Sequence, residues 1–155
     1  MYSTLLNLSR NIFFYKKIKL EDTFETRIYL MFIHFSILMI IFKKKGSKFS
    51  QKSYDNLFHN IEYNLRESGF GDVTVNKKMK EFNKILYDIL LKIDEKKEIV
   101  NTFKLNPITV KKYFNDLDKN NDKYNEFERY FNNFYNFCFE YPLDNMIEEL
   151  NKFEY

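Results

Sequence analysis

The chain has 155 residues, with 25 Lys and Arg against 22 Asp and Glu and a formal net charge of +3. Its length predicts a single domain over residues 1–155 that can bury a core, and its small net charge does not by itself indicate a nucleic-acid binder, so no specific DNA partner is expected. The single cysteine, Cys138, excludes an internal disulfide, and two scattered histidines give no metal-ligand spacing, so neither a metal nor another cofactor is expected.

The residue usage limits how helices in this chain can be stabilised. Lys, Asn, Ile, Phe and Tyr are abundant while alanine and tryptophan are absent, which is typical of an AT-rich genome. Without alanine, helices must depend on packed apolar faces more than on intrinsic propensity. The 18 Phe and 12 Tyr residues can supply that packing, because each aromatic ring buries a large area.

Two helices are predicted at the start of the chain. Residues 3–17 have apolar positions near helical spacing, and residues 22–44 are apolar nearly all round, which predicts a central position in a bundle. The run 28–42 is shorter than the roughly 20 residues that a membrane span needs, and His34 and Ser36 interrupt it. We interpret it as a buried core helix, with contact to a membrane surface or a partner, or spanning, as the alternatives.

A third helix is predicted over 51–68, followed by a tight corner. Gly69 stands where a helix C-terminal glycine supplies a left-handed conformation without a steric cost. Gly71 is expected to give a second unusual backbone geometry. Asp72 or Thr74 can then cap a fourth helix over about 75–98.

The start of that fourth helix is basic. On a helical wheel, Lys77, Lys80 and Lys84 cluster nearly opposite the apolar stripe, and Lys78 lies on the flank. A solvated face of an amphipathic helix has this pattern too. However, cations at a helix start oppose the helix dipole, so binding of an anionic partner is the second interpretation.

The remaining residues predict three more helices and no strand. Asn106 caps a short helix over 107–117, a polar linker follows, an aromatic helix covers 124–138, and Pro142 opens a last helix. The predicted fold is all-α, a single-domain irregular bundle of about six to seven helices. No nucleophile–base motif is readable, so no catalytic residues are assigned.

One polar pair stands out on the 22–44 helix. Arg27 and His34 are seven residues apart and therefore share one side of an otherwise apolar helix. His34 is either a satisfied core or interface histidine or, with Arg27, part of a polar site.

Two segments resemble the ubiquinol–cytochrome c chaperone family, which contains the mitochondrial assembly factor for cytochrome b and short bacterial relatives. Residues 14–35 carry an Asp-Thr…Arg…His pattern similar to the family's, at Asp22, Thr23, Arg27 and His34. A second segment resembles its Arg-Glu-x-Gly-x-Gly-Asp…Lys-Lys-x-Lys signature, with matches at Phe58, Glu62, Arg66, Gly69, Gly71, Asp72, Val75, Lys77, Lys78, Lys80 and Tyr87. The resemblance covers about residues 13–93, and the C-terminal helices over 107–153 diverge.

The resemblance implies a non-enzymatic assembly chaperone for cytochrome b and the ubiquinol–cytochrome c reductase complex. Its expected partners are newly made cytochrome b as the client, and a ribosome, a small partner protein or an anionic membrane surface. The helices at 22–44 and 124–138 are candidate apolar client surfaces. The expected location is the bacterial cytoplasm, with peripheral contact at the inner membrane, and the mitochondrial matrix is the alternative.

The expected partner-binding residues are Arg27, His34, Glu62, Arg66, Asp72, Lys77, Lys78 and Lys80, with Gly69 and Gly71 forming the turn that aims the basic helix. Two other functions stay open. The protein could be a peripheral membrane-surface protein without a client, or a small ligand-binding or enzymatic bundle that uses Arg27, His34 and Glu62.

Overall fold

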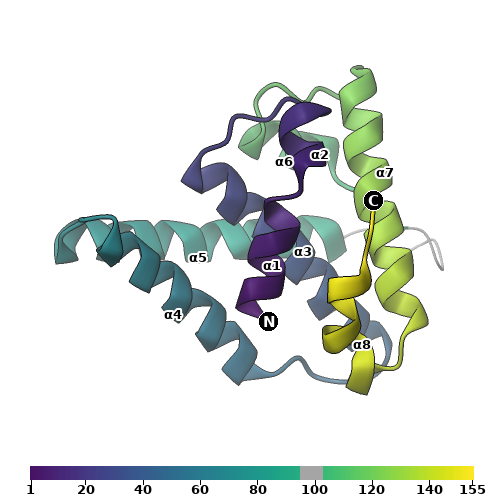
Figure 1. Cartoon of the computed structure of the whole chain (residues 1–155), viewed down its shortest axis with the longest axis horizontal. Helices are drawn as coiled ribbons and strands as arrows, with labels where there is room; N and C mark the ends of the chain where they lie inside the picture. Colours follow the sequence, from purple (N-terminus) through teal and green to yellow (C-terminus); the bar gives the residue numbers. More distant parts are fainter. Residues whose placement is uncertain (95–102) are drawn as a thin grey trace.

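The protein is an all-α bundle, as the sequence predicts (Figure 1). The computed structural model describes residues 1–94 and 103–155, and these contain α-helices and one 3-10 turn but no strand. The elements are α1 (Tyr2–Ser9), α2 (Ile12–Lys16), α3 (Phe24–Lys44), α4 (Gln51–Glu67), α5 (Asp72–Asp94), α6 (Pro107–Tyr113), α7 (Asp122–Glu140), α8 (Leu143–Glu149) and η1 (Leu150–Lys152).

The first predicted helix is divided into two. α1 ends at Ser9, and α2 begins after Asn11, whose side chain accepts a hydrogen bond from the Phe13 backbone N–H. An asparagine favours this capping geometry over a continued helix because its side chain competes for backbone donors. The prediction of one helix over 3–17 was therefore wrong about its continuity.

The central element is α3, which packs against α1, α5 and α7. It begins after Thr23, whose Oγ1 accepts a hydrogen bond from the Thr26 backbone N–H at 3.1 Å. Its residues 30–38 are all buried. Among the described residues it is the one helix long and apolar enough for a membrane span, but 67% of that apolar window is buried inside the protein. The structure thus supports the interpretation of α3 as a buried core helix. Such helices can be as long and as apolar as a membrane span.

Helices α4 and α5 form a hairpin whose corner lies at the opposite end of the molecule from α7 (Figure 1). Ser50 caps α4, and Gly69 adopts φ +91° after its last turn, as expected of a helix C-terminal glycine. Gly71 has no positive φ and open space where a Cβ would lie, which corrects the expectation of a second unusual geometry. α5 begins at Asp72 rather than near residue 75, so Asp72 and Thr74 lie inside the helix and neither precedes it as a cap. The predicted end at 98 lies outside the described residues.

The aromatic helix α7 packs against α3. Asn121 caps α7, and its inward side chains are buried in the core: Tyr124, Phe127, Tyr130, Phe131, Phe134, Tyr135 and Cys138. The expectation that α3 and α7 offer apolar surface to a client is therefore wrong. Each helix is apolar because the two helices bury these surfaces against each other and their neighbours.

Candidate functional site

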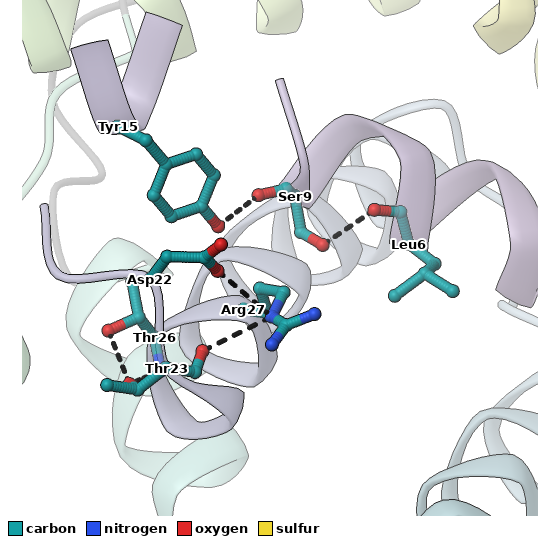
Figure 2. A network of polar contacts seen from close by, with 7 residues as sticks. All are labelled: Leu6, Ser9, Tyr15, Asp22, Thr23, Thr26 and Arg27. Carbon is teal, nitrogen blue, oxygen red and sulfur yellow. Dashed lines mark hydrogen bonds and ion pairs between the residues drawn. The ribbon is translucent and has the colours of Figure 1, made fainter. Parts of the chain in front are cut away.

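The first cluster surrounds the expected site residue Arg27 and holds the start of α3 against the segment before it (Figure 2). Arg27 Nε donates to the Thr23 carbonyl oxygen at 3.3 Å and lies 3.3 Å from Asp22 Oδ1. Thr23 also shares a hydrogen bond of 2.9 Å with the Thr26 hydroxyl. Thr23 thus caps the first turn of α3, and Arg27 ties that turn to Asp22 and to the Thr23 backbone.

The same region joins α1 to α2. The Tyr15 hydroxyl donates to the Ser9 carbonyl oxygen at 2.6 Å, and the Ser9 hydroxyl donates to the Leu6 carbonyl oxygen at 2.7 Å (Figure 2). Burial, with the nearby Asp22 carboxylate as the second cause, raises the pKa of Tyr15 to about 12. Its hydroxyl therefore stays protonated near neutral pH and can keep this bond.

A second cluster closes the corner between α4 and α5. Arg66 pairs with Glu62 one turn earlier, with Nη2 and Oε1 2.9 Å apart, and its Nη1 also bonds to Asp72 at the start of α5. The hydrogen bonds to Asp72 and then to Glu62 raise the pKa of the Arg66 guanidinium. All three side chains are at the surface, so their contribution to stability is modest. They link the last turns of α4 to the first residue of α5 across the Gly69 turn.

The lysines after this corner do not behave alike. Lys78 Nζ lies 3.5 Å from Glu25 Oε1 in the first turn of α3 and 5.3 Å from the centre of the Phe70 ring. It therefore ties α5 to α3 and to the corner. Lys77 and Lys80 are exposed, and neither makes an ion pair within residues 1–94 and 103–155. Of the three predicted lysines, these two are available to a partner.

The exposed surface of α5 continues beyond the lysines. Lys77, Lys80, Lys84, Tyr87 and Leu91 follow one another at steps of three and four residues, so they form one stripe, which we name the α5 outer face. Tyr87 is 53% exposed and Leu91 is 61% exposed. Sequence reasoning did not assign Leu91, although its helical spacing from the lysines was a usable signal.

His34 is not part of any surface site, which corrects its assignment to partner binding. Its side chain is fully buried, with Nδ1 2.7 Å from the Leu30 carbonyl oxygen and Nε2 3.0 Å from the Tyr130 hydroxyl. Because a carbonyl only accepts, Nδ1 carries the proton and Nε2 accepts from Tyr130. Burial lowers the pKa of His34 to about 4. The interpretation as a satisfied core histidine is the one the structure supports.

Arg27 and His34 are seven positions apart in α3, and this separation explains their different surroundings. A rise of 1.5 Å per residue places them roughly 10 Å apart along the helix axis, although they lie on one side of it. Arg27 is in the first turn, where the side chain reaches solvent, whereas His34 faces Phe131 and Phe134 of α7. In the described part of the chain, no three His, Cys, Asp or Glu side chains gather as a metal site would require.

A comparison with protein families matches residues 16–130 to the family described as ubiquinol–cytochrome C chaperone. That match spans more than half of the chain. The chain belongs to the ubiquinol–cytochrome c chaperone family. The match covers both clusters and the α5 outer face, and it extends into α7, beyond the segment identified by motif. Comparisons with curated proteins and with solved structures found no match.

Family membership gives a context to the two clusters. A chaperone family points to a non-enzymatic role in the assembly of a complex. The residues that resemble the family's motifs are here mainly a helix cap, an ion-paired corner and a core histidine. These residues make contacts within and between helices, and the α5 outer face stays exposed.

Proposed function

We propose that this protein is a non-enzymatic chaperone for cytochrome b during assembly of the ubiquinol–cytochrome c reductase complex. Family membership supports the chaperone role, and the α5 outer face is the observation that supports its mode of binding. That face carries three exposed lysines and two exposed apolar side chains in one stripe. An apolar client and an anionic partner can both find complementary chemistry there.

The basic part of the face suits an anionic partner. Lys77, Lys80 and Lys84 lie on one face of α5 between its second turn and its middle, so their positive potentials add. A ribosomal surface or an acidic partner protein has the complementary charge. Work in the bacterial cytoplasm, with contact at the inner membrane, is consistent with either partner, and the mitochondrial matrix is the alternative location.

The apolar part of the face replaces the client surface expected on α3 and α7. Tyr87 borders a shallow groove of about 110 Å³ that is lined in part by Met39, Phe49, Tyr54 and Leu90. Exposed apolar side chains beside such a groove are typical of contact with an apolar segment. We place the hydrophobic segment of the client here.

The proposal is tested by cross-linking pull-down from the native cell. The Lys77/Lys80/Lys84→Glu variant should lose cytochrome b or ribosomal proteins while its circular dichroism remains helical. Lys78 is left unchanged because it pairs with Glu25.

A matched control changes the same number of charges at other exposed lysines, Lys16, Lys119 and Lys123. It should recover partners as the wild type does. Equal recovery by both variants would show that the α5 outer face is not the binding surface. If the wild type recovers neither cytochrome b nor ribosomal proteins, the chaperone proposal itself fails.

A second candidate is a peripheral membrane-surface protein without a client. The combination of lysines with Tyr87 and Leu91 on one face favours it, because anionic lipid attracts basic residues and the interface accepts aromatic and apolar ones. Flotation with anionic vesicles distinguishes the two. This alternative would be favoured if the purified protein bound the vesicles strongly and the Lys77/Lys80/Lys84→Glu variant did not. It also requires that the cross-linking pull-down recovers no client.

A further inference from the structure

A cavity of about 450 Å³ lies between α1, α3 and the end of α4. Its volume falls in the range of small-molecule sites. The two arginines Arg10 and Arg27 line it, together with apolar side chains of α1 and α3 and polar side chains of α4. No residue of the α5 outer face lines the cavity, so an inference about its ligand does not depend on the proposed function.

The guanidinium of Arg27 is only partly satisfied by its own chain. Nε donates a hydrogen bond to the Thr23 carbonyl oxygen and forms an ion pair with Asp22. The two terminal nitrogens have no hydrogen bond or ion pair among the described residues, and Figure 2 shows a terminal nitrogen pointing away from Asp22 and Thr23. An arginine held on one edge presents its other edge to a carboxylate or phosphate in two parallel hydrogen bonds.

Arg10 brings a second positive charge to the same cavity. It is exposed at the end of α1, and its side chain makes no ion pair within the described part of the chain. Two guanidiniums around one cavity repel each other unless an anion lies between them. One carboxylate, Glu67, also lines the cavity, but its Oε1 already accepts a hydrogen bond from the Tyr63 hydroxyl at 2.8 Å.

The floor of the cavity is apolar. Leu6 and Phe24 line it with partly exposed side chains, and the almost completely buried Ile28 and Met31 lie beside them with little accessible surface. Tyr2 and Asn64 complete the wall and are already hydrogen-bonded to each other. The cavity therefore combines cationic donors with an apolar base, which suits a ligand that carries both kinds of group.

We propose that this cavity binds an anionic amphiphile, with a carboxylate or phosphate group held by Arg10 and Arg27 and an apolar chain on the α1–α3 floor. Either a fatty acid or a lipid phosphate supplies this chemistry. The two sources differ in headgroup charge and geometry, so they can be distinguished by experiment.

The test uses calorimetric titration of the full chain with decanoate, decyl phosphate, decanol and inorganic phosphate. Decanoate or decyl phosphate should bind measurably, and the tighter of the two identifies the headgroup. Decanol and inorganic phosphate should bind at least ten-fold more weakly, because each lacks one half of the ligand.

Arg10→Gln is the informative variant because it removes an exposed side chain that the fold does not use. It should weaken binding of the preferred amphiphile about ten-fold, the effect of losing one charge-assisted hydrogen bond. Arg27→Lys keeps the positive charge but removes the guanidinium edge that can donate two parallel hydrogen bonds. It should also weaken binding of the amphiphile about ten-fold. Arg129→Gln removes an exposed arginine of α7 and should leave the affinity unchanged. Binding of decanol as tight as that of decanoate and decyl phosphate, or an Arg10→Gln variant that matches the wild type, would overturn the proposal.

Discussion

The buried histidine of α3 makes the stability of this protein depend on pH in a calculable way. The pKa of His34 is about 4 in the folded protein because of burial, whereas an unfolded histidine has a pKa near 6.5. The unfolded chain therefore binds the extra proton between these two values, and the free energy of unfolding falls as the pH decreases through this window. Between pH 7.5 and pH 5 the loss from His34 is about 2 kcal/mol.

A His34→Gln variant isolates this contribution. Gln does not titrate, and its amide oxygen can still accept from the Tyr130 hydroxyl, whose pKa burial raises so that it remains a donor. The variant should be less stable than the wild type at pH 7.5, since the fit in the core is poorer, but its stability should fall by about 2 kcal/mol less on going to pH 5.

Urea denaturation at both pH values measures this difference. The matched control is His59→Gln, which removes the exposed histidine of α4 and should show the same fall as the wild type. If His34→Gln and the wild type lose equal stability between pH 7.5 and pH 5, the buried neutral histidine is not the cause and the reasoning fails. A ¹⁵N spectrum of the ring should independently show the proton on Nδ1.

Three further predictions concern single positions. Gly69→Ala should destabilise the protein by about 1 kcal/mol because φ is +91° there, whereas Gly71→Ala should change the urea midpoint little; equal effects would contradict this account of the corner. Ser36→Ala should stabilise by about 1 kcal/mol, since the Ser36 hydroxyl is buried without a hydrogen-bond partner in the described residues, and a lower melting temperature would refute this. Cys138 is fully buried and burial raises the pKa of its thiol, so a thiol reagent should label it only as the protein unfolds; immediate labelling of folded protein would argue against that burial.

The two roles of the α5 lysines could not be separated by sequence reasoning. Lys77, Lys78 and Lys80 all lie in one short basic segment. A helical wheel gives the direction of each side chain around the helix axis, but it does not show which side chains of other helices lie nearby. The position of Glu25 in the first turn of α3 makes Lys78 an internal ion-pair partner. Since Glu25 and Lys78 are distant in sequence, only the packing of α3 against α5 brings them together.

The sequence by itself determined most of the helices, two of their caps and the apolar faces, because these depend on interactions within one or two turns. Ser50, Asn106 and the left-handed Gly69 act as local chemistry predicts, whereas Thr23 proved to be a cap although the prediction placed it inside the 22–44 helix. Only the tertiary structure decided which apolar surface is covered. α3 and α7 have surfaces that suit a client, yet they bury each other and leave the α5 outer face and the Arg10–Arg27 cavity exposed. Burial depends on how distant helices pack, and helical periodicity identifies an apolar face without identifying what covers it.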